Sequence, residues 1–159
     1  MIAPLAAAVA AALACPATPV HGEPLPQSGT LSSLKWVQAT PRRAGIVGIL
    51  FGYDGRLVDP ARPTFALWTR GVAPEGWHTK VLWNIRNRHA GNDVAIRGRR
   101  LDAPGRFAQR FHAVGTDGSA RGSFYASIVE LPAAGCWRLD VGSGGARGTL
   151  VLRAVDAPS

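Results

Sequence analysis

Five arginines that lie close together in the sequence are the residues best suited to chemistry. They are Arg86, Arg88, Arg97, Arg99 and Arg100. Apolar residues alternate over residues 79–86 and 94–99, which predicts two neighbouring strands with Trp83 and Ile96 on their inner face. Arg86, Arg97 and Arg99 would then share the outer face, where guanidinium groups bind phosphate or carboxylate oxygens. We therefore predict a patch for an anionic ligand. The alternative is a solvated face without a ligand.

The histidines and acidic residues form no motif for catalysis or metal binding. No two of the four histidines are two or four residues apart, and none of the ten acidic residues forms a D-x-D-x-D calcium loop. We therefore expect no metal, no cofactor and no enzymatic activity. The enzymatic alternative is a small extracytoplasmic hydrolase whose site is built from loop residues. Its candidates are His78, His89, His112, Asp93 and Asp117.

One glycine-rich segment is similar to a protease motif. Gly142-Ser143-Gly144-Gly145 is similar to the end of G-D-S-G-G, but Gly142 stands where that motif has its aspartate. The chain of 159 residues is also too short for the double barrel of such proteases. We predict a hairpin turn here rather than a nucleophile.

Residues 1–14 predict a signal peptide. They are uncharged and apolar or small, and Ala12-Leu13-Ala14 fits an A-x-A cleavage site, although no Lys or Arg precedes the apolar run. Cleavage near Gly22 is the alternative. We expect residues 15–33 to be a flexible segment and residues 34–156 to form one domain.

The two cysteines, Cys15 and Cys136, predict neither a disulfide framework nor a metal site. Cys15 directly follows Ala14 and partly matches a lipobox, which makes it a candidate for lipidation. If Cys15 is lipidated or removed, Cys136 is left without an intramolecular partner. We expect Cys136 to be a partly covered structural residue on the opposite face of its strand from Trp137.

The charge of the chain is strongly basic, with a net charge of +8 and an isoelectric point of about 11.0. Sixteen of the 18 basic residues are arginine, and alanine, glycine and proline are frequent, which indicates a compositional bias. An attraction to lipid headgroups, envelope polymers or nucleic acid is the competing interpretation. We expect no exposed aromatic residues between the five arginines of the predicted patch, so stacking on single-stranded bases is not indicated.

Short alternating segments bounded by turn residues predict an all-β fold. Nine strands are expected, over residues 35–39, 45–52, 64–69, 79–86, 94–99, 106–114, 124–130, 135–142 and 149–155. This number and spacing favours an immunoglobulin-like antiparallel β-sandwich of about seven to nine strands. Trp83 is the candidate for the central core tryptophan. Trp137 takes the corner position that tyrosine has in immunoglobulin domains, and Leu139 replaces the bridging cysteine, so we expect no core disulfide.

The C-terminal third also resembles a known group of proteins. Ser127-Ile128-Val129, Leu131-Pro132 and Gly135-Cys136-Trp137-Arg138-Leu139 resemble a group of uncharacterised bacterial secreted proteins and lipoproteins with the motif P-x-x-G-C-W-R-L. Segments 46–51, 80–83 and 98–101 are similar to the same group. The resemblance implies an immunoglobulin-like sandwich and an exported location. It implies no catalytic residues.

These features predict an exported, non-catalytic binding or interaction module of the cell envelope. Its location would be extracytoplasmic, whether secreted, periplasmic or anchored by an N-terminal lipid. The expected partner is an anionic envelope surface or another envelope protein, and the ligand itself is not named by the sequence. Two alternatives stay open, the small hydrolase and a basic nucleic-acid-binding protein. The latter conflicts with export, because exported proteins rarely meet nucleic acid.

Overall fold

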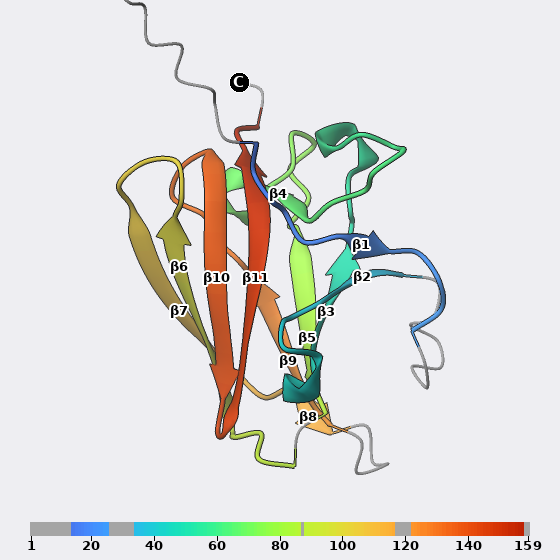
Figure 1. Cartoon of the computed structure of the whole chain (residues 1–159), viewed down its shortest axis with the longest axis vertical. Coiled ribbons are helices and arrows are strands. Elements are labelled where there is room, and N and C mark those ends of the chain that lie inside the picture. Colours follow the sequence, from blue (N-terminus) through green and yellow to red (C-terminus); the bar gives the residue numbers. More distant parts are fainter. Residues whose placement is uncertain (1–13, 26–33, 87, 117–121, 158–159) are drawn as a thin grey trace, which may run out of the picture.

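Two β-sheets pack face to face in the computed structural model of the chain, which describes residues 14–25, 34–86, 88–116 and 122–157 (Figure 1). The first sheet has the strand order β1-β2-β3-β5-β9-β8 and the second β4-β11-β10-β6-β7. Residues 1–13 of the predicted signal peptide, residues 26–33 and Asp117 lie outside the described residues. Within the described residues, no helix is long and apolar enough to cross a membrane.

All nine predicted strands are present, with shifted ends. They are β2 Lys35–Gln38, β3 Ile46–Phe51, β4 Ala66–Trp68, β5 Lys80–Ile85, β6 Asp93–Arg100, β7 Arg106–His112, β9 Ser123–Ile128, β10 Gly135–Ser143 and β11 Ala146–Val155. Two strands of two residues, β1 Val20–His21 and β8 Gly115–Thr116, were not predicted. Three short 3₁₀ turns, η2 Arg42–Ala44, η3 Gly55–Leu57 and η4 Thr69–Gly71, lie between strands.

The order of the strands is that of an immunoglobulin domain. Strands β3-β5-β9-β8 correspond to A-B-E-D, and β11-β10-β6-β7 correspond to G-F-C-C′ of the variable type. The neighbouring long strands within each sheet are antiparallel, and β4 runs parallel to β11 at the edge of the second sheet. The immunoglobulin-like β-sandwich predicted from the sequence is therefore confirmed.

The core lies between the sheets because alternate residues of each strand face inward. Trp83 on β5 and Trp137 on β10 are 0 % and 1 % exposed, as predicted. The indole Nε1 of Trp137 donates a hydrogen bond to the carbonyl of Ala133, 3.0 Å away and four residues upstream. The tyrosine corner of immunoglobulin domains makes the same kind of bond, so Trp137 occupies the predicted corner position.

The expectation that the two cysteines form no disulfide is wrong, because Cys15 and Cys136 are joined by an S–S bond of 2.01 Å. The bond is not at the core position between the sheets, which Leu139 occupies on β10. Their Cα atoms are 5.4 Å apart, within the usual range. Cys136 does point away from the core, opposite to Trp137, but the N-terminal segment covers it and leaves it only 6 % exposed. An Sγ in a disulfide cannot also carry a lipid through a thioether, so lipidation of Cys15 and this bond exclude each other.

The N-terminal segment belongs to the sandwich as far as residue 25, so the expectation of a flexible stretch is wrong there. The Thr18 amide donates to the Val151 carbonyl at 2.8 Å, and the Val151 amide donates to Thr18 Oγ1 at 2.9 Å. Strand β1 pairs with β2, and Leu25 packs against Trp36 on the outer face of the first sheet. This path places Cys15 beside β10.

Candidate anion-binding surface

The five arginines predicted as one patch do not lie on one surface. Strands β5 and β6 are in different sheets, so Arg86, which follows β5, is separated from Arg97 and Arg99 on β6. Arg88 lies in the connecting loop, and its Nε donates to His89 Nε2 at 3.3 Å. Arg100 has the inward parity of its strand and pairs with Asp102 at 2.8 Å. The prediction assumed that β5 and β6 pair as a hairpin, whereas the chain passes from the first sheet to the second between them.

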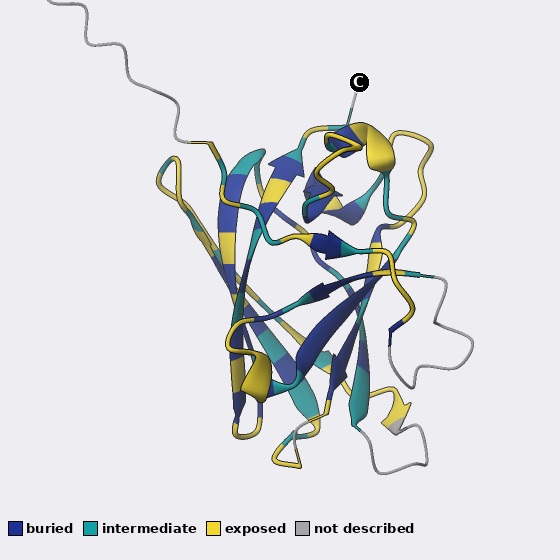
Figure 2. Ribbon diagram, turned by 45° about the vertical axis from the view of Figure 1, so that its right-hand side comes forward, coloured by how far each residue is buried: buried dark blue, intermediate teal, exposed yellow. Residues whose placement is uncertain are grey.

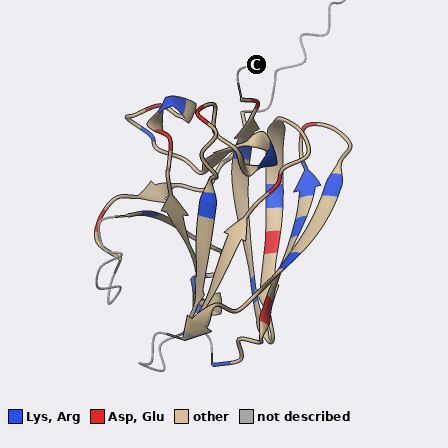
Figure 3. Ribbon diagram, turned by 180° about the vertical axis from the view of Figure 1, so that it is seen from behind, with Lys and Arg blue, Asp and Glu red and all other residues tan. Residues whose placement is uncertain are grey.

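A larger basic surface covers the outer face of the second sheet, and we call it the arginine face. Along β6, β7 and β11 the outward positions are in general more exposed than the inward ones, as the alternating colours in Figure 2 show. Figure 3 shows the basic residues that this alternation gathers on the outer side. Six of the seven outward arginines of this sheet make up the arginine face, namely Arg97 and Arg99 on β6, Arg106 and Arg110 on β7, Arg138 on β10 and Arg147 on β11. The seventh, Arg153 on β11, lies beside the N-terminal segment and is not included.

Three of these arginines form a row across adjacent strands. Arg99 is directly opposite Arg106 on β7 and directly opposite Arg138 on β10. Like charges in directly opposed positions destabilise a sheet. Within the described residues, the guanidinium groups of Arg97, Arg99 and Arg106 have no hydrogen-bond or ion-pair partner. The row therefore costs stability and leaves donors free for an external anion.

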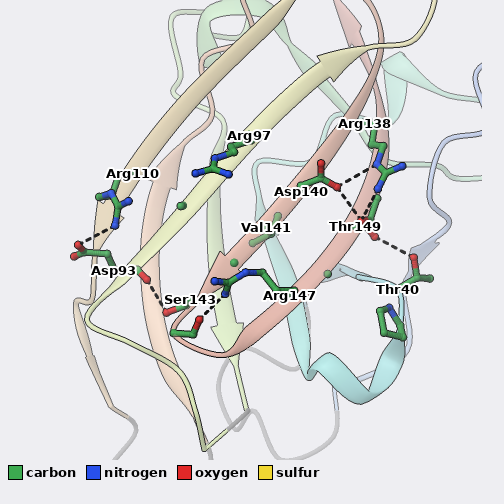
Figure 4. Close-up of a pocket in the computed structure, with 15 residues that line it drawn as sticks. Thr40, Asp93, Arg97, Arg110, Arg138, Asp140, Val141, Ser143, Arg147 and Thr149 are labelled. Atoms are coloured by element: carbon green, nitrogen blue, oxygen red, sulfur yellow. Dashed lines mark hydrogen bonds and ion pairs between the residues drawn. The ribbon is translucent and has the colours of Figure 1, made fainter.

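A hollow of about 530 Å³ opens on this face, between β7 and the β10–β11 hairpin (Figure 4). Its floor is made of small residues, because Ala95 and Gly142 are opposite each other in one cross-strand row. The same row ends in Arg110 on one side and Arg147 on the other. We call this cavity the first hollow. One arginine thus stands at each end of this row of small residues, and the Arg147 side chain lies over Gly142.

A second hollow, of about 620 Å³, adjoins the first. Arg97, Arg138 and Asp140 line both hollows and so form the border between them. Arg99, Arg106 and Ala108 line the second hollow alone. The two hollows follow one another along the strands of the same face.

Two aspartates moderate the positive charge of the arginine face. Asp140 accepts hydrogen bonds from Arg138 Nε at 3.1 Å and from Thr149 Oγ1 at 3.0 Å. Asp93 pairs with Arg110 at 3.5 Å and with His112 at 2.5 Å. Six arginines thus stand with two carboxylates, and the face keeps a positive excess.

The hydrolase candidates that the structure describes are not all brought together, and Asp117 lies outside the described residues. His112 contacts Asp93, but its side chain is 88 % exposed and lines neither of the two hollows. His78 precedes β5 whereas His89 follows it, so they lie at opposite ends of the sandwich. Within the described residues, no group of three or more His, Cys, Asp or Glu side chains could hold a metal ion.

Ser143 is a structural residue of the β10–β11 hairpin, as predicted for its glycine-rich segment. It is 3 % exposed, and its Oγ donates to the Asp93 carbonyl at 2.6 Å and lies 2.9 Å from the Tyr125 hydroxyl. Ser143 pairs with Ala146, so Gly144 and Gly145 form the two-residue turn. Gly144 has φ +52°, which explains glycine at this position.

Sequence reasoning missed Arg106, Arg110, Arg138 and Arg147. Each alternates with inward apolar residues on its own strand, which is a visible signal. Grouping them required the strand order β7-β6-β10-β11, and that order is a tertiary property.

Comparison with protein-family models gives no match, and neither does comparison with curated proteins. The suggested resemblance to secreted bacterial proteins therefore stays a prediction.

Proposed function

We propose that this chain is an exported, non-catalytic immunoglobulin-like module that binds an anionic partner of the cell envelope through the arginine face. One observation carries the proposal, namely the row in which Arg99 stands directly between Arg106 and Arg138. This arrangement opposes folding, and no carboxylate among the described residues compensates Arg99 or Arg106. An external anion that binds across the row would replace the mutual repulsion of the arginines with a net attraction.

The disulfide supports the exported location. Disulfides form and persist in oxidising compartments outside the cytosol. Cleavage of a signal peptide after Ala14 would keep Cys15 as the first residue and preserve its bond to Cys136. Cleavage near Gly22 would remove Cys15 together with β1. We therefore propose that processing occurs after Ala14 and that Cys15 is used in the disulfide rather than lipidated.

The experiment measures binding to vesicles of anionic phosphatidylglycerol and of neutral phosphatidylcholine, using protein secreted into the periplasm of a bacterial host. The test variant carries Arg97→Ser, Arg99→Ser and Arg106→Ser together. Its matched control carries Lys35→Ser, Arg62→Ser and Arg70→Ser, which removes the same charge from exposed positions away from the arginine face.

We expect the wild type and the control to sediment with anionic vesicles at low salt, and binding to weaken at high salt. A basic residue near an anionic surface contributes about 1 kcal/mol, so the test variant should bind roughly 100-fold more weakly. Equal weakening of the test variant and the control would contradict a dedicated surface. Tighter binding of the wild type to single-stranded DNA than to anionic vesicles would instead favour the nucleic-acid alternative.

A further inference from the structure

We infer that the arginine face contains two adjoining oxyanion subsites, which bind one ligand through two phosphate or sulfate groups about 7 Å apart. This inference rests on the proposed function, because it uses the same surface. It goes further by assigning one group to the first hollow and the other to the second.

The first hollow has the features of a preformed subsite. Arg147 Nη1 donates to the carbonyl oxygens of Gly144 and Ala146, at 2.5 and 2.7 Å, which fixes the guanidinium in place (Figure 4). Its other donors stay available for a ligand. The Arg147 side chain lies directly over Gly142, where an added Cβ would be 2.9 Å from Arg147 Cδ and would displace this side chain. Preorganised arginine forks of this kind suit tetrahedral oxyanions.

The second hollow has less fixed but more numerous donors. Arg97, Arg99 and Arg106 line it, and their guanidinium groups have no partner among the described residues. Ala108, directly opposite Arg97, leaves open space beside them. An oxyanion placed here would be within reach of three positive side chains.

Asp140 divides the two subsites. Its carboxylate lies on the border that the two hollows share, with Arg138 bonded to it. A single anion directly over Asp140 would be repelled, whereas anions over Ala95 in the first hollow and over Ala108 in the second avoid the carboxylate and keep the arginines. Ala95 and Ala108 are diagonal neighbours on adjacent strands, about 7 Å apart, and this sets the spacing between the groups.

The test uses inorganic tripolyphosphate and orthophosphate, measured by isothermal titration calorimetry on the whole secreted protein. Tripolyphosphate carries more charge, so charge alone would also favour it. The deciding variants therefore change shape and leave charge unaltered. Gly142→Ala displaces Arg147 in the first hollow, and Ala108→Leu fills the second. The matched control is Ala126→Leu, on the outer face of the first sheet.

We expect the wild type and the control to bind tripolyphosphate at least tenfold more tightly than orthophosphate. Each filled hollow should reduce tripolyphosphate affinity at least tenfold, whereas the control should leave it within twofold of the wild type. Thermal melts establish that each variant is folded. Unchanged tripolyphosphate affinity in both filled variants would overturn the two-subsite inference, even if vesicle binding persists.

Vesicles and tripolyphosphate also separate the two sources of paired oxyanions. A preference for long-chain polyphosphate over vesicles at equal phosphate concentration would identify a single polymer as the ligand. A preference for vesicles would identify neighbouring lipid headgroups. Failure of the wild type to bind either vesicles or polyphosphate would contradict the proposed function itself.

Discussion

Removal of the disulfide is expected to destabilise the sandwich strongly. The bond joins residues separated by 121 positions, so it closes most of the chain into one loop. For a loop of roughly 100 residues, chain entropy in the unfolded state corresponds to about 4.7 kcal/mol, and measured losses for native disulfides are about 2–5 kcal/mol. We therefore expect Cys15→Ala with Cys136→Ala to lower the free energy of unfolding by about 3–5 kcal/mol.

Urea denaturation of the secreted protein measures this loss, with and without a reducing agent. The reducing agent should shift the wild-type midpoint to that of the double variant and leave the double variant unchanged. The midpoint of the double variant with and without the reducing agent is the control for nonspecific effects of the reagent. A double variant as stable as the oxidised wild type would refute the account of how the N-terminal segment is held.

Three further predictions concern the core, the arginine row and the ion pair of Asp54 with Arg56. Trp83→Ala and Trp137→Ala should each lower the free energy of unfolding by about 3–5 kcal/mol in urea titrations, whereas an exposed Trp77→Ala should change it little. Arg99→Ser should raise stability by about 0.2–1 kcal/mol at low salt and less at high salt, and a loss of stability would contradict the proposed strain. The hydrogen bond from Arg56 lowers the pKa of Asp54 below its ordinary 3.8. The stability that the Asp54 carboxylate contributes through Arg56 is therefore complete above the pKa that Asp54 has in the unfolded chain. It is lost as the pH falls through the lower pKa that Asp54 has in the folded protein. Thermal melts from pH 5 downward should show a steeper fall for the wild type than for Asp54→Asn, and parallel curves would exclude this contribution.

The fold could be predicted from the sequence because its signals are local. Alternation of apolar residues located nine strands, and Gly135 with Trp137 two residues later located the corner of the sandwich. Strand parity also placed Cys136 on the outer side of β10. These properties depend on residues a few positions apart, which a single sequence displays directly.

The site could be predicted only in part because it depends on which strands are neighbours. Arg97 and Arg99 were correctly expected on an outer face, but their neighbours are Arg106 and Arg138 rather than Arg86. The disulfide was missed for a related reason. Cys15 was excluded from pairing by its position after Ala14, and only the path of residues 15–20 along β11 brings it to Cys136.

The central claim is that an anion binds across the arginine face, and an NMR titration of the ¹⁵N-labelled secreted protein with tripolyphosphate tests it most directly. Arginine Nε–H signals report the side chains themselves, and backbone amides report the strands. We predict the largest shifts at Arg97, Arg99, Arg106 and Arg147 and along β6, β7 and β10, with little change on β3 and β5. Shifts confined to the first sheet or to Arg62 and Arg70, or none at all, would contradict the account.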